Sequence, residues 1–271
     1  GDNPSNHALL DWLAVEFIES GWDVQHLFRL MVTSSTYRQS AVVTPLKLEK
    51  DPQNRFLSRG PRFRMDAEML RDHALAVSGL LQSKVGGPSV KPYQPEGVWE
   101  AVAMPESNTR RYERDRGDAL YRRSLYTFWK RAAPPAMMDT FNAPSREVCS
   151  VRRERTNTPL QALATLNDVT FVEAARVLAQ DLLRSTGGKP SKVLAQLARR
   201  ALARPFTPAE ANVIRATWND MRSHYAGHLA EAADLLKQGE APPDPMLRPA
   251  DVAALTVVVN QVLNLDEVLN K

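Results

Sequence analysis

Apolar residues recur with a helical period along most of this sequence, and that pattern limits the folds open to it. Residues spaced by three and four positions lie on one side of an α-helix and can face a common core. The clearest runs extend from Leu9 to Ile18, Leu70 to Leu81, Phe171 to Leu182, Val193 to Ala201 and Val252 to Val262. No alternating strand pattern continues for more than a few residues. The sequence therefore predicts an all-α fold, a bundle-like domain of several helices.

Several of the expected helices carry residues that mark their ends. Residues 158–161 and 207–210 both read Thr-Pro, then one further residue, then Gln or Glu. This is a capping box with proline at the first helical position, so both segments are expected to begin helices. Asp23 is placed to cap an earlier helix. A further helix is expected over 66–82, with the glycine pair at 86–87 ending it.

At 271 residues the chain is within the size of one domain, and we expect a single helical domain over residues 1–271. The helical pattern fades from about residue 88 to residue 150, where prolines and charges accumulate. We interpret this stretch as a long, loop-rich basic insertion. The opening residues contain neither Met nor a basic and apolar leader, so we expect a piece of a longer protein. The longest apolar run, residues 254–259, is far shorter than the roughly 20 residues that cross a bilayer, and no membrane span is expected.

Positive charge gathers in one part of the sequence. Residues 109–155 hold twelve Lys or Arg residues and six acidic residues, a net charge of +6, although the whole chain carries only +4. Eleven of the twelve cations are arginine, whose planar guanidinium suits sulfate, phosphate and carboxylate groups. Three of them directly precede the helix expected after Thr158, where unpaired N–H groups already give a positive end.

This concentration predicts an anion site, possible ligands being a sulfate, a phosphate or the carboxylate of an acidic polysaccharide. The expected anion-binding residues are Arg122, Arg123, Lys130, Arg146, Arg152, Arg153, Arg155 and Thr158, with Tyr126 and Trp129 as an aromatic platform. A structural alternative is that Asp139, Glu147, Glu154 or Asp168 folds back and pairs with the arginines. A third reading is a docking surface for another domain. Arginine with aromatic residues also suits single-stranded nucleic acid, but a charge of +4 over the chain makes that ligand less favoured.

The other groups of chemically reactive residues give weaker indications of a functional site. Asp220, His224, His228 and Glu231 would share one face of a helix, and two histidines four apart can hold a metal. No third ligand is evident beyond that helix, so we interpret it as a solvated strip and expect neither a metal site nor a cofactor. Cys149 lies among arginines but near no recognisable base, and we expect it to be buried and inert.

Long blocks of the sequence resemble a known family. The blocks are residues 7–40, 51–81, 121–179 and 262–271. They are similar to the planctomycete surface-protein C-terminal domain, domain of unknown function fifteen-fifty-three. The resemblance implies export to the periplasm or cell surface. It also implies a parent protein in which a cytochrome c-like module and other domains are the partners of this chain. It further implies that the segment that precedes residues 4–6 in the family is missing from this sequence. The family has no established catalytic residues to transfer.

Two functions remain open from the sequence. The first is a non-catalytic accessory module that docks onto partner domains or holds an acidic polysaccharide through the arginine and aromatic segment. The second is an enzyme acting on polysaccharide, with Asp139, Glu147 and Asp168 as candidate general acid and base groups. Two carboxylates roughly 5–10 Å apart in an open cleft would favour the enzyme. Carboxylates held by arginines would favour the module, which is our prediction.

Overall fold

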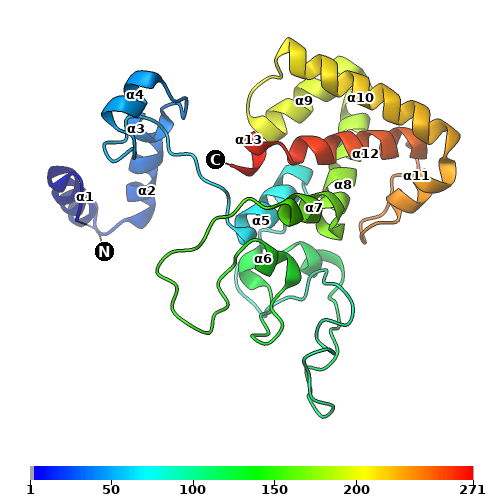
Figure 1. Cartoon of the computed structure of the whole chain (residues 1–271), viewed down its shortest axis with the longest axis horizontal. Helices are drawn as coiled ribbons and strands as arrows, with labels where there is room; N and C mark the ends of the chain where they lie inside the picture. The colour runs from blue at the N-terminus through cyan, green and yellow to red at the C-terminus, as the bar shows by residue number, and fades with distance from the viewer. Residues whose placement is uncertain (1–2, 271) are drawn as a thin grey trace. The chain divides into compact units, whose positions relative to one another are not determined.

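The computed structural model describes residues 3–270, and these residues form thirteen α-helices, two short 3-10 turns and no strand (Figure 1). The all-α expectation is therefore confirmed for the described chain. Contacts divide it into unit 1, residues 3–63, and unit 2, residues 64–270, which are treated separately. The expectation of a single domain over 1–271 stays a prediction, because this division does not say whether the units fold together.

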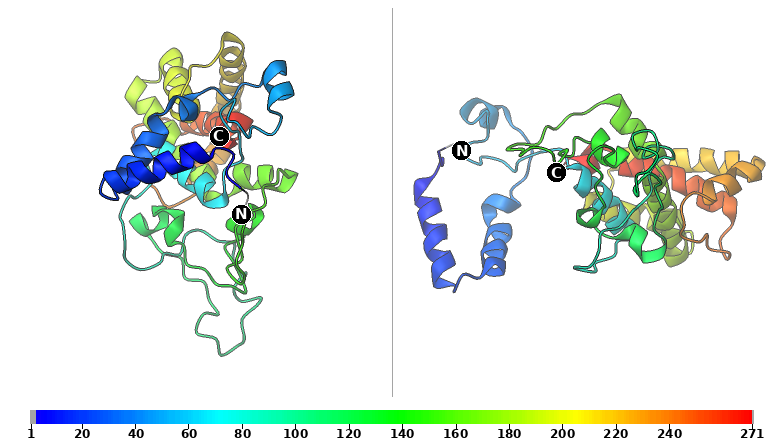
Figure 2. Two further views of the ribbon diagram at one scale, coloured as in Figure 1. Left: turned by 90° about the vertical axis from the view of Figure 1, so that its left-hand side faces the viewer. Right: turned by 90° about the horizontal axis from the view of Figure 1, so that it is seen from below.

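Unit 1 consists of four helices. They are α1 (His7–Glu19), α2 (Val24–Thr33), α3 (Ser35–Arg38) and α4 (Pro45–Lys50). Asp23 caps α2 as expected, its carboxylate accepting the N–H of His26 at 3.0 Å. Figure 2 shows α1 and α2 as the two arms of a hairpin. Helix α4 was not predicted, although Thr44 and Pro45 repeat the Thr-Pro signature that marks two other helix starts.

The apolar residues of unit 1 lie on its surface. Among residues 3–63, no apolar side chain is buried, and Leu10, Trp12 and Phe28 are 50–60% exposed. Monomeric proteins rarely expose apolar patches of this extent unless another surface covers them. The helical period and the Asp23 cap therefore predicted α1 and α2 correctly, but they did not imply a core there.

The main core of unit 2 lies between the helices of its C-terminal half. These are α8 (Val169–Thr186), α9 (Pro190–Leu202), α10 (Pro208–Gly227), α11 (Leu229–Leu236) and α12 (Pro249–Leu263), followed by α13 (Asp266–Leu269). Helix α12 packs against α8, α10 and α11 (Figure 1). Leu178, Leu255 and Val259 on the facing sides are fully buried. These are the inward positions that the sequence pattern predicted. In the described residues, no helix has both the length and the apolar character that a membrane span requires.

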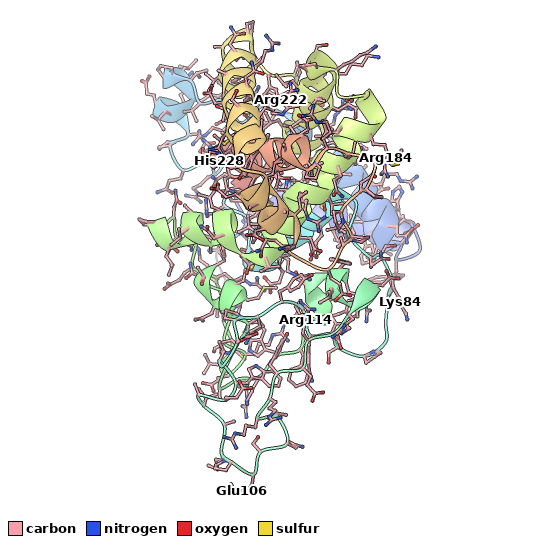
Figure 3. All side chains as sticks on the ribbon, turned by 90° about the vertical axis from the view of Figure 1, so that its right-hand side faces the viewer. Lys84, Glu106, Arg114, Arg184, Arg222 and His228 are labelled. Carbon is pink, nitrogen blue, oxygen red and sulfur yellow. The ribbon has the colours of Figure 1, made fainter. Side chains whose placement is uncertain are left out.

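Short elements and loops join this core to the start of unit 2. Helix α5 (Ala67–Ser78) ends earlier than expected, because Gly79 adopts a left-handed conformation with φ of 85° and closes the helix. Between α5 and α7 (Pro159–Asn167) come only η1 (Gly117–Tyr121), η2 (Ser124–Tyr126) and α6 (Ala136–Thr140). A loop carrying Glu106 at its tip extends away from the helices (Figure 3). The loop-rich stretch is thus present where it was predicted.

Helix α7 faces the protein with its polar side. Gln161 and Thr165 are buried, whereas Leu160 and Leu163 are 62% and 57% exposed. The Gln161 amide donates to the Thr140 carbonyl at 3.0 Å, and the Thr165 hydroxyl donates to Asn264 after the end of α12. Buried polar groups need such partners, and here the partners determine which face turns inward. The leucines consequently point outward.

Both predicted capping boxes form, at Thr158 and at Thr207. The second is coupled to an ion pair, because Arg204 donates to both carboxylate oxygens of Glu210 at 2.9 Å. Hydrogen bonds from Arg204, and then from the N–H of Thr207, lower the pKa of Glu210 to about 2.

This pKa shift predicts a pH-dependent contribution to stability. A carboxylate whose folded-state pKa is below its ordinary value of 4.5 stabilises the fold above that value, and the contribution is lost as pH falls toward about 2. We expect Glu210→Gln to lower the melting temperature at neutral pH and the difference from wild type to disappear near pH 2. Thermal melts of both proteins across this range measure it. A difference that is the same at all pH values would contradict the assignment.

Candidate functional site

Four of the seven cations predicted to bind an anion, Arg146, Arg152, Arg153 and Arg155, lie on one long loop. Residues 143–157 connect α6 to α7 without any helical turn, and we refer to them as the arginine loop. Loops of this length without secondary structure of their own are uncommon in folded domains and are usually functional or linkers. The length and charge of the arginine loop therefore make it a candidate binding segment.

The second half of the arginine loop is fixed to the protein. Arg153 donates to both oxygens of Glu68 on α5, at 2.6 and 3.1 Å, and these hydrogen bonds raise the pKa of Arg153. Arg155 lies 3.5 Å from Asp66 at the start of the same helix. The Thr156 hydroxyl accepts from the Gln161 amide at 2.9 Å. Arg153 and Arg155 thus hold the loop in place.

The first half of the loop presents its cations outward. The guanidinium of Arg146 lies 4.6 Å from the centre of the Trp129 ring, and the Trp129 indole N–H donates to the Ser145 carbonyl at 3.1 Å. Arg152 is exposed, and within residues 3–270 its guanidinium has no hydrogen bond or ion pair. Between these two arginines, Val148 and Val151 are also exposed. The exposed part of the loop therefore lies between the hydrogen bond of Ser145 with Trp129 and that of Arg153 with Glu68.

Three other predicted cations are engaged elsewhere in unit 2. Arg122 is buried, donates to the carbonyls of residues 84, 86 and 88, and stacks 3.8 Å from the Tyr126 ring. Arg123 lies 3.8 Å from Asp72, and Lys130 donates to the Thr109 carbonyl at 2.8 Å. Arg122 is thus a structural residue that stabilises the turn at residues 84–88. Because it stacks on Tyr126, that ring is not free to act as part of the expected aromatic platform. Thr158 serves as the cap of α7.

Pairing of the arginines with carboxylates, the structural alternative, does occur, but the carboxylates are not the expected ones. Arginines do pair with carboxylates, but these come from α5 (Asp66, Glu68 and Asp72) rather than from Asp139, Glu147, Glu154 or Asp168. Proximity in the sequence could not predict these ion pairs, because α5 precedes the arginine loop by more than 60 residues. Pairing over that separation depends on the tertiary fold.

The candidate catalytic carboxylates lie on different elements. Asp139 is exposed on α6, Glu147 is exposed on the arginine loop, and Asp168 caps α8 by accepting the Thr170 N–H at 2.9 Å. Burial raises the pKa of Asp168, while its hydrogen bonds from Thr170 and the charge of Arg71 act in the opposite direction. A carboxylate committed to a helix cap is poorly placed for proton transfer to a substrate.

The histidine strip differs from the expectation. Helix α10 ends at Gly227 and α11 begins at Leu229, so the four residues do not share one helix. The His224 ring stacks 4.3 Å from the His228 ring and bonds to Glu231 at 3.0 Å. In the described chain, no group of three metal-ligating side chains is found. Cys149 is exposed in the arginine loop, so the expectation of a buried cysteine is wrong.

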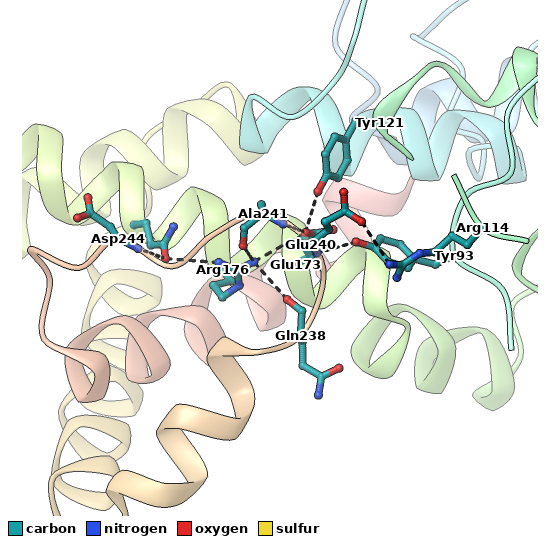
Figure 4. A network of polar contacts seen from close by, with 10 residues as sticks. Tyr93, Arg114, Tyr121, Glu173, Arg176, Gln238, Glu240, Ala241 and Asp244 are labelled. Atoms are coloured by element: carbon teal, nitrogen blue, oxygen red, sulfur yellow. Dashed lines mark hydrogen bonds and ion pairs between the residues drawn. The ribbon is translucent and has the colours of Figure 1, made fainter. Parts of the chain in front are cut away.

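Sequence reasoning missed a buried polar network on α8, which Figure 4 shows. Glu173 and Arg176 have fully buried side chains 3.8 Å apart. Glu173 accepts from the Tyr121 hydroxyl at 2.9 Å and from the Ala241 N–H at 2.6 Å, while Arg176 donates to the Ala241 carbonyl at 2.6 Å. The network fastens the chain between α11 and α12 onto α8. Its sequence signal was an acid and an arginine three residues apart inside an apolar helical pattern.

Comparison with known proteins places the chain in a family. The model for the family described as "PSD1: Protein of unknown function (DUF1553)" matches residues 1–218. The chain belongs to this family. No curated protein and no solved structure matches the chain.

Proposed function

We propose that this DUF1553 member is a non-catalytic binding module that holds an acidic polysaccharide through its arginine loop. The observation that carries the proposal is the arrangement of Arg146 and Arg152 on a loop fixed at Trp129 and at α5. Arg146 is stacked on an indole, and Arg152 has no partner in the part of the chain that the structure describes. Both guanidinium groups remain available for bidentate contacts with sulfate or carboxylate.

The anchored geometry supports binding because it reduces the entropy lost when a ligand is held. A mobile loop must be ordered on association, at a cost that weakens affinity. Here the pairing of Arg153 with Glu68 and the contact of Trp129 with Ser145 already restrict the loop. Arg153 and Arg155, which the sequence placed in the binding set, act in this account as supports.

The enzyme alternative has less support from the geometry. Its three candidate carboxylates lie on α6, on the arginine loop and at the cap of α8, and in the described part of the chain no hydrogen bond joins any two of them. Glycoside hydrolysis by two carboxylates requires both to face the same bond. A binding role requires no such pair.

The wider setting of the module is also a proposal. Because the chain belongs to this family and its sequence resembles the planctomycete surface-protein domain, we infer that the parent protein is exported. We further infer that a cytochrome c-like module and other domains of that protein are its partners. The exposed apolar residues of unit 1, such as Trp12 and Phe28, would suit contact with another domain.

A polysaccharide-binding measurement tests the proposed function. We expect the chain to bind a sulfated or uronic-acid polysaccharide with an affinity that falls as salt rises, because salt screens exposed charges. Replacing Arg146 and Arg152 together with alanine is expected to weaken binding by about tenfold or more. Isothermal titration at two salt concentrations measures both effects.

The matched control removes two other exposed arginines of unit 2. Arg184→Ala with Arg248→Ala causes the same loss of charge from side chains that are 67% and 78% exposed. This control should bind nearly as wild type does. Equal loss in both double variants would show that net charge, rather than the arginine loop, governs binding. Tighter binding of single-stranded DNA than of the polysaccharide would also contradict the proposal.

A further inference from the structure

Helices α1 and α2 of unit 1 contact each other along one side of each helix. The half-buried apolar residues of this hairpin recur at helical spacing: Leu13 and Phe17 on α1, and Leu27, Leu30 and Met31 on α2. Residues at this spacing share one side of a helix, so they form the seam between the two antiparallel arms (Figure 2). The seam covers only part of the apolar surface of either helix.

A second apolar row on each helix stays exposed. The two rows have the same spacing of four residues: Leu10, Ala14 and Ile18 on α1, and Val24, Phe28 and Val32 on α2. Apart from the small Ala14, these side chains are 44–60% exposed. We refer to the six residues as the hairpin face. None of them carries a charge.

Both rows lie on the same side of the hairpin. Each row is displaced from the seam by about 100°, in the direction in which residue numbers advance around the helix. Because the two helices are antiparallel, the same rotation on both leads to one common side. The His26 ring and the Glu16 carboxylate, 2.8 Å apart, join the helices on the opposite side. The hairpin therefore has the form of half a four-helix bundle, with its inner side uncovered.

A second copy of the chain offers a surface that matches the hairpin face. Two uncharged faces meet without placing a charge in the interface, which would be costly. Together they would bury about 1000 Å² of mostly apolar surface, the lower limit for a specific interface. The size and chemistry of the face thus suit a dimer of moderate affinity.

The charges at the edges of the face favour one arrangement of two copies. Asp11 lies at the outer edge of α1 and Arg29 at the outer edge of α2, and neither has an ion pair within residues 3–270. A twofold axis parallel to the helices sets α1 of each copy antiparallel to α2 of the other. Asp11 of each copy then comes within reach of Arg29 of the second copy. An axis across the helices would pair α1 with α1 and leave Asp11 without a cation opposite it.

We propose that the chain forms a homodimer in which the hairpin faces of two copies complete an antiparallel four-helix bundle. The six apolar residues of each copy form the core of this bundle, and the pairs of Asp11 with Arg29 set its arrangement. The inference goes beyond the proposed function and does not depend on the arginine loop. The contact with another domain proposed above would then use the opposite side of the hairpin, where Trp12 lies.

Sedimentation velocity of the full chain up to about 100 μM tests the dimer, because an interface of this size gives about micromolar affinity. We expect wild type to be dimeric and Phe28→Glu to dissociate at least about tenfold more readily, because the dimer would bury two unpaired charges. Phe28 is 60% exposed in one copy, so the variant should keep its fold, which circular dichroism verifies. The matched control is Trp12→Glu, which replaces an aromatic residue that is 50% exposed and should stay dimeric.

A charge exchange tests the arrangement of the two copies. Asp11→Arg alone, or Arg29→Asp alone, is expected to weaken association about fivefold, because like charges then face each other twice in the dimer. The two substitutions together recreate the opposite charges and should restore association to near the wild-type level. A monomeric wild type, equal dissociation of the two glutamate variants, or no recovery on charge exchange would overturn the proposal.

Discussion

Replacing Arg176 with methionine is expected to lower the free energy of unfolding by about 3–5 kcal/mol. The Arg176 side chain is fully buried, lies 3.8 Å from Glu173 and donates to the carbonyls of Gln238 and Ala241 at 3.2 and 2.6 Å. Methionine fills similar volume but leaves a buried carboxylate without its counter-charge and two carbonyls without their donor. Urea denaturation followed by circular dichroism measures the loss.

A second variant separates charge from packing. Glu173→Gln combined with Arg176→Met removes the uncompensated charge, while the amide oxygen still accepts from the Tyr121 hydroxyl and the Ala241 N–H. We expect this double variant to recover part of the stability that Arg176→Met loses. A loss below about 1 kcal/mol for Arg176→Met, the scale of an ordinary substitution, would show that the pair is not structural.

Gly239→Ala is expected to cost about 2–4 kcal/mol, the sum of backbone strain and a steric overlap. Gly239 has a φ of 85°, where side chains are disfavoured, and its Cβ would overlap the Glu173 carboxyl group. The Glu173 carboxyl group cannot move away freely, because it accepts hydrogen bonds from the Tyr121 hydroxyl and the Ala241 N–H. Thermal and urea unfolding of the variant measure this cost.

Gly97→Ala provides the control for this substitution. Gly97 also has a positive φ, 78°, but a Cβ there would have open space around it. Its alanine variant should therefore show the backbone strain alone, about 1 kcal/mol. The difference between the two variants reports the contact with Glu173. Equal losses at both glycines would contradict the close packing of the segment between α11 and α12 on α8.

Helices with strong local signals could be predicted from the sequence. The Thr-Pro capping boxes at Thr158 and Thr207 and the apolar period of α12 are local features, and the structure contains each of them. The end of α5 was misjudged because the first suitable glycine, Gly79, and not the later pair, closes the helix. Local rules thus predict elements better than boundaries.

The direction in which a helix faces was less predictable. Helix α7 turns Gln161 and Thr165 inward because their partners, at residues 140, 156 and 264, are brought together only by the tertiary fold. An apolar period alone would turn Leu160 and Leu163 inward. In unit 1 the same period marks helices whose apolar side chains remain exposed.

The candidate site could be predicted only in part, for the same reason. A count of charges located the basic segment, but it could not distinguish Arg122, which is buried against backbone carbonyls, from Arg152, which is exposed. The partners of Arg153 lie on α5, more than 80 residues earlier. Which arginines remain available is therefore decided by long-range contacts.

Hydrogen-exchange mass spectrometry with and without a saturating sulfated polysaccharide tests the central claim most directly. Bound ligand restricts local opening of the segment it contacts, so amide exchange there becomes slower. The account predicts slower exchange in residues 143–157 and no change in the loop from residue 93 to residue 114. Unchanged exchange in residues 143–157 at saturation, or slower exchange confined to other segments, would contradict it.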